Sequence, residues 1–184
     1  MRKKLLYIWL PLIPCWVRPM AKLEILVYPD ERLRQVSQPV KVIDNKIVSF
    51  ISDLEETLSS LPGCVGIAAP QVGFFERIII VDVSSRPQHK NHGYLVLINP
   101  VITFSEGNSI GREGCLSVPE YIGKVERSQN IEVKAKNELG AEVSYQMEGY
   151  EARAVQHEID HLDGKLFIDS LVGKRNTLKK RTDL

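Results

Sequence analysis

The sequence predicts an α+β fold, in which antiparallel or mixed β-sheets pack around a C-terminal helix that carries the pattern His-Glu-x-x-His. Three observations support this prediction. Short apolar runs rich in β-branched residues, separated by turn residues, are typical of strands. Apolar residues at three- and four-residue steps in two other segments are typical of amphipathic helices. The 184 residues, 43% of them hydrophobic, suffice for one sizeable core.

The N-terminal half is expected to hold two helical segments. Asp30 is a candidate N-cap for a short helical piece that follows it. Apolar side chains recur with helical spacing over residues 45–61, and Pro62-Gly63 would end that helix. The next segment, residues 66–73, is predicted to be a loop or an irregular edge strand.

Strands are expected at residues 77–83, 94–98 and 101–104, which are apolar and rich in β-branched side chains. Residues 131–135 and 141–146 alternate between apolar and polar side chains. They therefore predict an antiparallel pair, joined by a turn around Gly140.

The most informative helix is predicted from about Gly149 to Gly164, a glycine suited to the position just after a helix end. His161 follows His157 by four positions, which places the two side chains about 40° apart around a helix of 3.6 residues per turn. Both imidazoles therefore project from one face. An apolar stripe on the opposite face should pack on the sheet; it consists of Val155, Ile159 and Leu162.

Two imidazoles on one helix face can bind one divalent metal, with Glu158 beside the first as a candidate proton carrier. A hydrolytic metal site usually takes three protein ligands and leaves a position for water. Downstream, Phe167 stands where one class of metalloprotease has its third histidine. No glutamate follows Glu158, and Asp163 and Asp169 are poorly placed, so the third ligand is expected upstream.

Spacing alone does not choose among the upstream candidates, which are Cys15, Cys64, Cys115, His89 and His92. Chemistry favours Cys115, because its turn-like, glycine-flanked segment would let a thiolate and a backbone N–H approach one bound group together. Cys15 lies in an apolar run, where a lone cysteine usually behaves as a small hydrophobe. Cys64 is interpreted as a packing residue, and the two histidines lie in a polar connection.

Three segments, in this order, resemble the bacterial type of peptide deformylase: residues 66–73 (Gly-Ile-Ala-Ala-Pro-Gln-Val-Gly), 113–117 (Glu-Gly-Cys-Leu-Ser) and 156–161 (Gln-His-Glu-Ile-Asp-His). The similarity extends from about residue 23 to about residue 171. It implies a metal-dependent hydrolase that removes the N-formyl group from the N-terminal formylmethionine of newly synthesised proteins and releases formate.

The resemblance also implies residue roles. The metal ligands would be Cys115, His157 and His161. The general base would be Glu158, and the oxyanion donors would be Gln71 and the backbone N–H of Leu116. One divalent metal per chain is implied, with Fe(II) expected as the active form and Zn(II) as a stable substitute, since thiolate and imidazole ligands suit both.

Further residues are assigned by their positions relative to these motifs. Glu113 and Arg127 match a structural ion pair beneath the site. The methionine pocket is expected to be lined by Val65, Gly66, Tyr150 and Arg153. Family members usually have apolar residues at the last two positions. We therefore expect the Arg153 guanidinium to reach the pocket rim while its stem remains apolar.

Composition excludes some partners. The 24 basic and 23 acidic residues nearly cancel, so bulk charge predicts no general affinity for DNA or acidic membranes. Three cysteines without a disulfide-framework spacing suit a reducing compartment, and we expect a cytoplasmic protein.

The chain is predicted to contain one catalytic domain, residues 20–172. Residues 1–19 would be an extension: its apolar run is too short to span a bilayer and Pro11 and Pro14 interrupt it, although a weak signal-like character remains open. Translation starting at Met20 is one interpretation. Residues 173–184 form a basic tail, which is either a solvated end or a contact with the ribosome.

Two rival functions remain at this point. An endopeptidase of the His-Glu-x-x-His type would cleave unblocked peptides and would need a third ligand downstream. A metal-bound structural protein would need neither Glu158 nor Gln71, because a closed structural site requires no base and no oxyanion donor.

Overall fold

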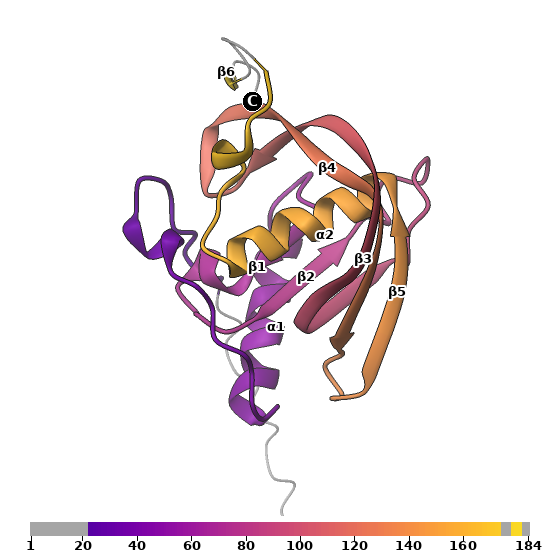
Figure 1. Cartoon of the computed structure of the whole chain (residues 1–184). Helices are drawn as coiled ribbons and strands as arrows, with labels where there is room; N and C mark the ends of the chain where they lie inside the picture. Colours follow the sequence, from indigo (N-terminus) through magenta and orange to yellow (C-terminus); the bar gives the residue numbers. More distant parts are fainter. Residues whose placement is uncertain (1–21, 174–177, 182–184) are drawn as a thin grey trace, which may run out of the picture.

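The computed structural model describes residues 22–173 and 178–181 (Figure 1). In these residues a six-stranded sheet curves around helix α2 (Gly149–Leu162), while helix α1 (Asn45–Ser59) packs elsewhere on the same sheet. All pairings between the strands are antiparallel. The predicted α+β class is therefore confirmed, in its antiparallel form.

The sheet has the strand order β1-β2-β3-β4-β5, with β6 paired to β4. The strands are β1 (Gly66–Ala68), β2 (Ile78–Asp82), β3 (Tyr94–Cys115), β4 (Val118–Lys136), β5 (Glu142–Glu148) and β6 (Leu178–Lys180). Three short 3-10 turns complete the described elements: η1 (Glu31–Arg34), η2 (Ala69–Val72) and η3 (Phe167–Ser170).

Strand β2 is buried on both faces, which explains its continuous apolar sequence. Successive side chains of a strand point to opposite faces. Ile79 and Val81 accordingly join the cluster that contains α2, and Ile78 and Ile80 join the cluster that contains α1. The centre of the sheet is thus sandwiched between the two helices, although the strand is antiparallel to both of its neighbours.

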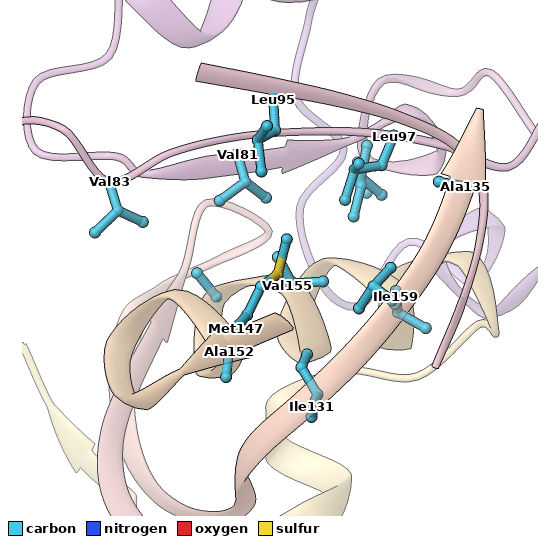
Figure 2. Close-up of a cluster of buried hydrophobic side chains, with 14 of the residues drawn as sticks. Val81, Val83, Leu95, Leu97, Ile131, Ala135, Met147, Ala152, Val155 and Ile159 are labelled. Carbon is cyan, nitrogen blue, oxygen red and sulfur yellow. The ribbon is translucent and has the colours of Figure 1, made fainter. Parts of the chain in front are cut away.

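Helix α2 packs into the hollow of the sheet through the face opposite its histidines. Figure 2 shows Val155 and Ile159 directed toward the side chains of Val81 and Leu97. Leu162 belongs to the same buried cluster, so the predicted stripe is confirmed. This packing fixes the rotation of α2 about its axis, and therefore the direction in which its opposite face points.

Gly164 follows α2 with a positive φ of 70°, as its place after the helix predicted. A Cβ atom at this position would lie 2.4 Å from the backbone oxygen of Arg34. Both conformation and close approach therefore require glycine. The contact docks the end of α2 against the last residue of η1.

Most predicted elements are present with shifted ends. The helix predicted over residues 45–61 ends at Ser59, and Asp30 caps η1 by accepting a hydrogen bond of 2.9 Å from the Arg32 backbone N–H. Residues 66–68 form the edge strand β1. The pair at residues 131–135 and 141–146 is confirmed by the ladder between β4 and β5.

The prediction was wrong for the middle of the chain. Residues 94–98 and 101–104 are not separate strands but parts of β3, a single strand of 22 residues whose register with β4 shifts at three places. The segment around Cys115 is the end of β3 rather than a turn-like stretch, and the turn is formed by Leu116 and Ser117. Most side chains from Phe104 to Arg112 are exposed, so no apolar pattern indicated a strand there.

The predictions for residues 1–19 fall outside the described residues, as do those for Lys174 and Arg175 of the tail. Lys179 and Lys180 belong to β6 and are exposed. Over residues 22–173 and 178–181, none of the helices has the length and apolarity needed to cross a bilayer.

Candidate metal centre and active site

Three predicted ligands meet at the face of α2 opposite its apolar stripe. Cys115 ends β3, while His157 and His161 project from consecutive turns of the helix. Their ligand atoms lie within 4.8 Å of one another, and the Cys115 Sγ is 3.2 Å from the His161 Nε2. Within the described part of the chain, this is the group of three such side chains that could hold a metal ion. Of the upstream candidates, the fold brings Cys115 to the histidines.

The electrostatics of this cluster favour a thiolate. Burial raises the pKa of Cys115, but the neighbouring imidazoles of His161 and His157 outweigh it and hold the pKa well below the usual range of a thiol. A deprotonated cysteine is the form that binds metals. Together with two imidazoles it makes a donor set that fits zinc or ferrous iron.

Glu113 orients the first histidine from beneath the site. Its Oε2 is 2.9 Å from the His157 Nδ1, which leaves the other ring nitrogen of His157 to face the ligand cluster. Arg127 donates to both carboxylate oxygens of Glu113, through Nε at 3.0 Å and Nη2 at 2.9 Å. The ion pair anticipated from the sequence is therefore present, and it is buried.

The side chain of Gln71 is held in one orientation. Its Oε1 accepts a hydrogen bond of 2.9 Å from the Ala68 N–H, so the Nε2 must point the other way. That Nε2 lies 3.4 Å from the Cys115 Sγ and 3.2 Å from the Ser117 Oγ. Gln71 is 2% exposed, and its amide thus offers N–H groups beside the thiolate.

Glu158 faces the same space from α2. Its side chain is buried, and its Oε2 has no hydrogen-bond partner among the described residues. Burial raises the pKa of Glu158 to about 7, against the opposing effect of the two neighbouring imidazoles. An orphaned buried carboxylate oxygen next to three metal-type donors is what a site that receives water or substrate requires.

Five of these residues line one cavity of about 220 Å³: Gln71, Glu113, Cys115, His157 and Glu158. Leu116, in the turn after β3, forms part of its wall, and so do Val65, Gly66 and Tyr150. The structure therefore gathers the residues assigned to the substrate pocket around the metal-type cluster. Their binding roles remain predictions.

The Arg153 side chain differs from the expectation in one respect. It lines the cavity, but its guanidinium does not extend to the rim. Nη1 donates to Glu113 Oε1 at 2.7 Å, and Nη2 donates to the Ser109 carbonyl at 2.6 Å. The reason is electrostatic: the buried carboxylate of Glu113 on β3 is a stronger hydrogen-bond partner for the guanidinium than solvent is.

Three of the alternative ligands are engaged elsewhere, whereas Cys64 lines the cavity without joining the ligand cluster. Asp163 pairs with Arg77 at 2.8 Å, and Asp169 pairs with Arg34. His92 bonds through Nδ1 to the buried carboxylate of Glu151 at 2.8 Å. None of these residues belongs to the ligand cluster.

Sequence reasoning missed several contributors. Ser117, whose Oγ accepts a hydrogen bond from the Gln71 amide, is the last residue of the recognised motif at 113–117, but no role was assigned to it. Gln156 joins α2 to β4 through two hydrogen bonds: its side chain accepts from the Ser128 N–H at 3.0 Å and donates to the Ser128 carbonyl at 2.9 Å. Arg86 and Arg181 also line the cavity, and no local pattern indicated them.

Comparison with known proteins agrees with this geometry. Residues 22–177 match the family model of polypeptide deformylase. A peptide deformylase of Thermodesulfovibrio yellowstonii is 42% identical over 163 residues, which cover 88% of this chain and 97% of that protein.

Solved structures show the same likeness. A peptide deformylase from Legionella pneumophila superposes with a TM-score of 0.76 at 39% identity, covering 83% of this chain and 87% of the other. A class I type b peptide deformylase from Acinetobacter baumannii, bound to Met-Ala-Ser, gives a TM-score of 0.76 at 33% identity, with 83% and 99% covered. The fold, the order of the motifs and these matches lead to one conclusion: the chain belongs to the peptide deformylase family of enzymes.

Proposed function

We propose that this enzyme removes the formyl group from formylmethionine at the start of newly made polypeptides, with release of formate, and that it requires one divalent metal ion. The observation that carries this proposal is the convergence of Cys115, His157 and His161 beside an unpartnered carboxylate oxygen of Glu158. Membership of the peptide deformylase family supports the choice of substrate.

Cys115, His157 and His161 would hold the metal. When bound, a divalent ion supplies Lewis-acid chemistry that makes water a stronger acid and a carbonyl a better electrophile. Glu113 keeps the His157 ring in the orientation needed for ligation.

Glu158 is assigned the proton transfers. Its carboxylate accepts the proton of the attacking water and later delivers it to the departing amine of methionine. Its burial keeps bulk water from competing for these steps.

Gln71 and Leu116 are assigned to the formyl oxygen. The Gln71 Nε2 and the Leu116 backbone N–H would donate to this oxygen as negative charge develops on it. Loss of one such donor typically lowers turnover by about 10²–10³. Gln71→Leu should therefore cripple turnover while metal content stays close to that of the unmodified enzyme.

The direct test measures formate released from formyl-Met-Ala-Ser by the metal-loaded enzyme. Glu158→Gln should lower turnover by about 10²–10⁴ with the metal retained. Asp163→Asn is the matched control, because this carboxylate is two residues from His161 but pairs with Arg77; it should leave turnover intact. Cleavage of unblocked peptides, or equal turnover in both variants, would contradict the proposal.

The metal is proposed to be Fe(II), with Zn(II) as a less active substitute. The donor set alone suits both ions. Protein loaded anaerobically with each metal should release formate faster with iron, and equal rates would remove the preference.

Residues 20–172 are proposed as the catalytic domain, and the family match beginning at residue 22 supports this boundary. Protein that starts at Met20 should retain the turnover of the full chain. Loss of turnover would show that residues 1–19 contribute.

The basic tail is proposed to contact the ribosome, and the exposed Lys179 and Lys180 of β6 support this role. Co-sedimentation with ribosomes should weaken as the salt concentration rises. Absence of binding at every salt concentration would exclude the contact.

A further inference from the structure

The wall of the active-site cavity carries an excess of positive charge that the proposed chemistry does not use. Arg86, Arg112 and Arg181 all line this cavity, and they come from three separate parts of the chain. None of the three forms an ion pair within residues 22–173 and 178–181.

Arg86 lies in the connection between β2 and β3 and packs against an aromatic ring of the cavity wall. Its guanidinium lies over the ring of Tyr150, with Cζ 5.2 Å from the ring centroid. Its Nε is buried and has no hydrogen-bond partner among the described residues. A buried donor without a partner is unusual, and an acceptor atom of a bound ligand would satisfy it.

Arg181 reaches the cavity from the C-terminal strand. β6 pairs with β4 near Tyr121, and the Arg181 backbone N–H donates to the Glu120 carbonyl at 2.6 Å. Its Nη2 is 2.5 Å from the point that a Cβ atom on Gly114 would occupy. The guanidinium therefore covers the backbone of β3 beside the Cys115 ligand. Arg181 lies beyond the residues that match the family model.

Arg112 adds a third positive charge on β3. In the β-ladder it stands opposite Lys124 of β4, and both residues are exposed. Like charges directly opposite each other on two strands are unfavourable. A carboxylate bound at the cavity would relieve this repulsion.

The two acidic residues of the cavity wall do not neutralise these arginines. Glu113 is fully engaged by Arg127, Arg153 and His157. Glu158 is buried beside the ligand cluster, where the chemistry takes place. The cavity therefore presents unpaired positive charge to a substrate that enters it.

We propose that Arg86, Arg112 and Arg181 make the enzyme select formylated peptides with an acidic side chain shortly after formylmethionine. This inference rests on the proposed function, because it assumes that the formyl end lies beside Cys115. An extended peptide rises about 3.3 Å per residue, so its second to fourth residues lie within roughly 10 Å of the first. These residues must leave the cavity past its arginine-bearing wall.

A carboxylate can come from an aspartate side chain or from the C-terminus of a short peptide. The inference commits to the side chain, and amidated substrates distinguish the two sources. The experiment measures kcat/KM for formyl-Met pentapeptide amides that carry Asp, Asn or Lys at residue two, three or four and alanine elsewhere. At one or more of these positions kcat/KM should be higher for the Asp peptide than for the Asn peptide, and lowest for the Lys peptide. Each exposed ion pair between an arginine and the substrate carboxylate would raise kcat/KM by up to about fivefold.

Variants and salt then test the assignment. Arg112→Gln, Arg181→Gln and Arg86→Gln should each lower the ratio of kcat/KM between Asp and Asn peptides, and the triple variant should bring it close to one. Lys134→Gln is the matched control, because Lys134 is exposed on β4 but lines a different cavity. Added salt should also reduce the ratio, because exposed charges are screened.

Three results would overturn the inference. These are equal kcat/KM for Asp and Asn peptides at all three positions, a ratio that survives in the triple variant, or a preference seen only with free C-terminal carboxylates. Each leaves the proposed function standing, because formyl peptides are still turned over. An enzyme inactive on every formyl peptide refutes the proposed function itself, and this inference with it.

Discussion

At the scale of single residues, Glu113 is the group on which the metal-type cluster depends. Its Oε1 accepts hydrogen bonds from Arg127 and Arg153, and its Oε2 accepts from Arg127 and faces His157. Burial raises the pKa of Glu113, but the hydrogen bonds from His157 and Arg127 outweigh it and hold the pKa well below the usual range. The carboxylate is thus a fixed negative charge beneath the site.

Glu113→Gln should damage both stability and metal binding. The substitution leaves the buried Arg153 guanidinium without its anion and leaves Arg127 paired with Asp160 alone. Breaking a buried pair in this way costs about 3–5 kcal/mol. Loss of a partner that orients a ligating histidine lowers metal affinity by about 10–100-fold. Urea unfolding and metal titration measure the two effects.

Glu126→Gln serves as the control for that experiment, because Glu126 is an exposed glutamate on the neighbouring strand β4. It should leave both quantities near their original values. Unchanged metal affinity in Glu113→Gln would show that His157 does not need the contact with the Glu113 carboxylate in order to bind the metal.

Individual site residues were predictable from the sequence to different degrees. His157, Glu158 and His161 follow from helix geometry alone, because their spacing places the histidines on one face. Cys115 needed chemical preference and family resemblance, since its neighbours in space are distant in sequence. The position of the Arg153 guanidinium was not predictable, because its acceptors lie on stretches of β3 and β4 that lack an apolar pattern.

At the scale of elements, the close packing of β1 against α2 decides where Glu158 lies. A Cβ atom on Gly66 would stand 2.6 Å from the Glu158 Oε1 and 2.9 Å from its Cγ. Only glycine lets the edge strand pass the Glu158 side chain at this separation. β1 thereby confines the carboxylate to the cavity.

Gly66→Ala should therefore displace the Glu158 side chain and lower kcat/KM. A misplacement of about 1 Å at a catalytic group can cost about 10²-fold. Metal content should stay unchanged, because the three heavy atoms nearest to the added methyl group all belong to Glu158 and none to a metal-type ligand. Formate release combined with metal analysis checks both parts, and normal turnover would contradict the packing argument.

Helices and short buried strands were predictable because one-sided or two-sided burial leaves a periodic pattern in the sequence. The outer halves of β3 and β4 leave no such pattern. Their side chains from Phe104 to Arg112 are mostly exposed, and three register shifts interrupt the ladder. Pairing of these strands depends on contacts distant in sequence, which local propensity does not report.

At the scale of the whole molecule, an ion pair ties the N-terminal segment to the segment that follows α2. Arg34 of η1 pairs with Asp169 of η3, and the Asp169 Oδ2 also accepts from the Leu166 N–H at 2.8 Å. Burial raises the pKa of Asp169, but the hydrogen bonds from Arg34 and Leu166 outweigh it and lower the pKa.

The lowered pKa gives this pair a defined pH dependence. Its stabilisation is fully present above the ordinary aspartate pKa of 3.8 and is lost as the pH falls through the lower folded-state pKa. Asp169→Asn should therefore lower the urea midpoint at pH 7, by a small amount because the pair is partly exposed. The difference should shrink as the pH falls below about 4, whereas a constant difference would contradict a charge-based contribution.

The fold class was predictable, because composition and two periodicities agree on it. The apolar side chains of the described residues form three buried clusters, on both faces of the sheet and beside η3, where the sequence predicted one core. Those patterns did not predict that three distant segments lie close together in space, namely residues 66–71, 113–117 and 157–161. Their proximity depends on the order of strands in one sheet and on the rotation of α2 that its buried stripe imposes.

X-ray absorption at the metal edge of the loaded enzyme tests the central claim most directly. For the zinc-loaded enzyme we predict one sulfur at about 2.3 Å, two imidazole nitrogens at about 2.0–2.1 Å and one oxygen of solvent. Cys115→Ser should remove the sulfur contribution. A ligand shell without sulfur, or with four protein donors, would contradict the account.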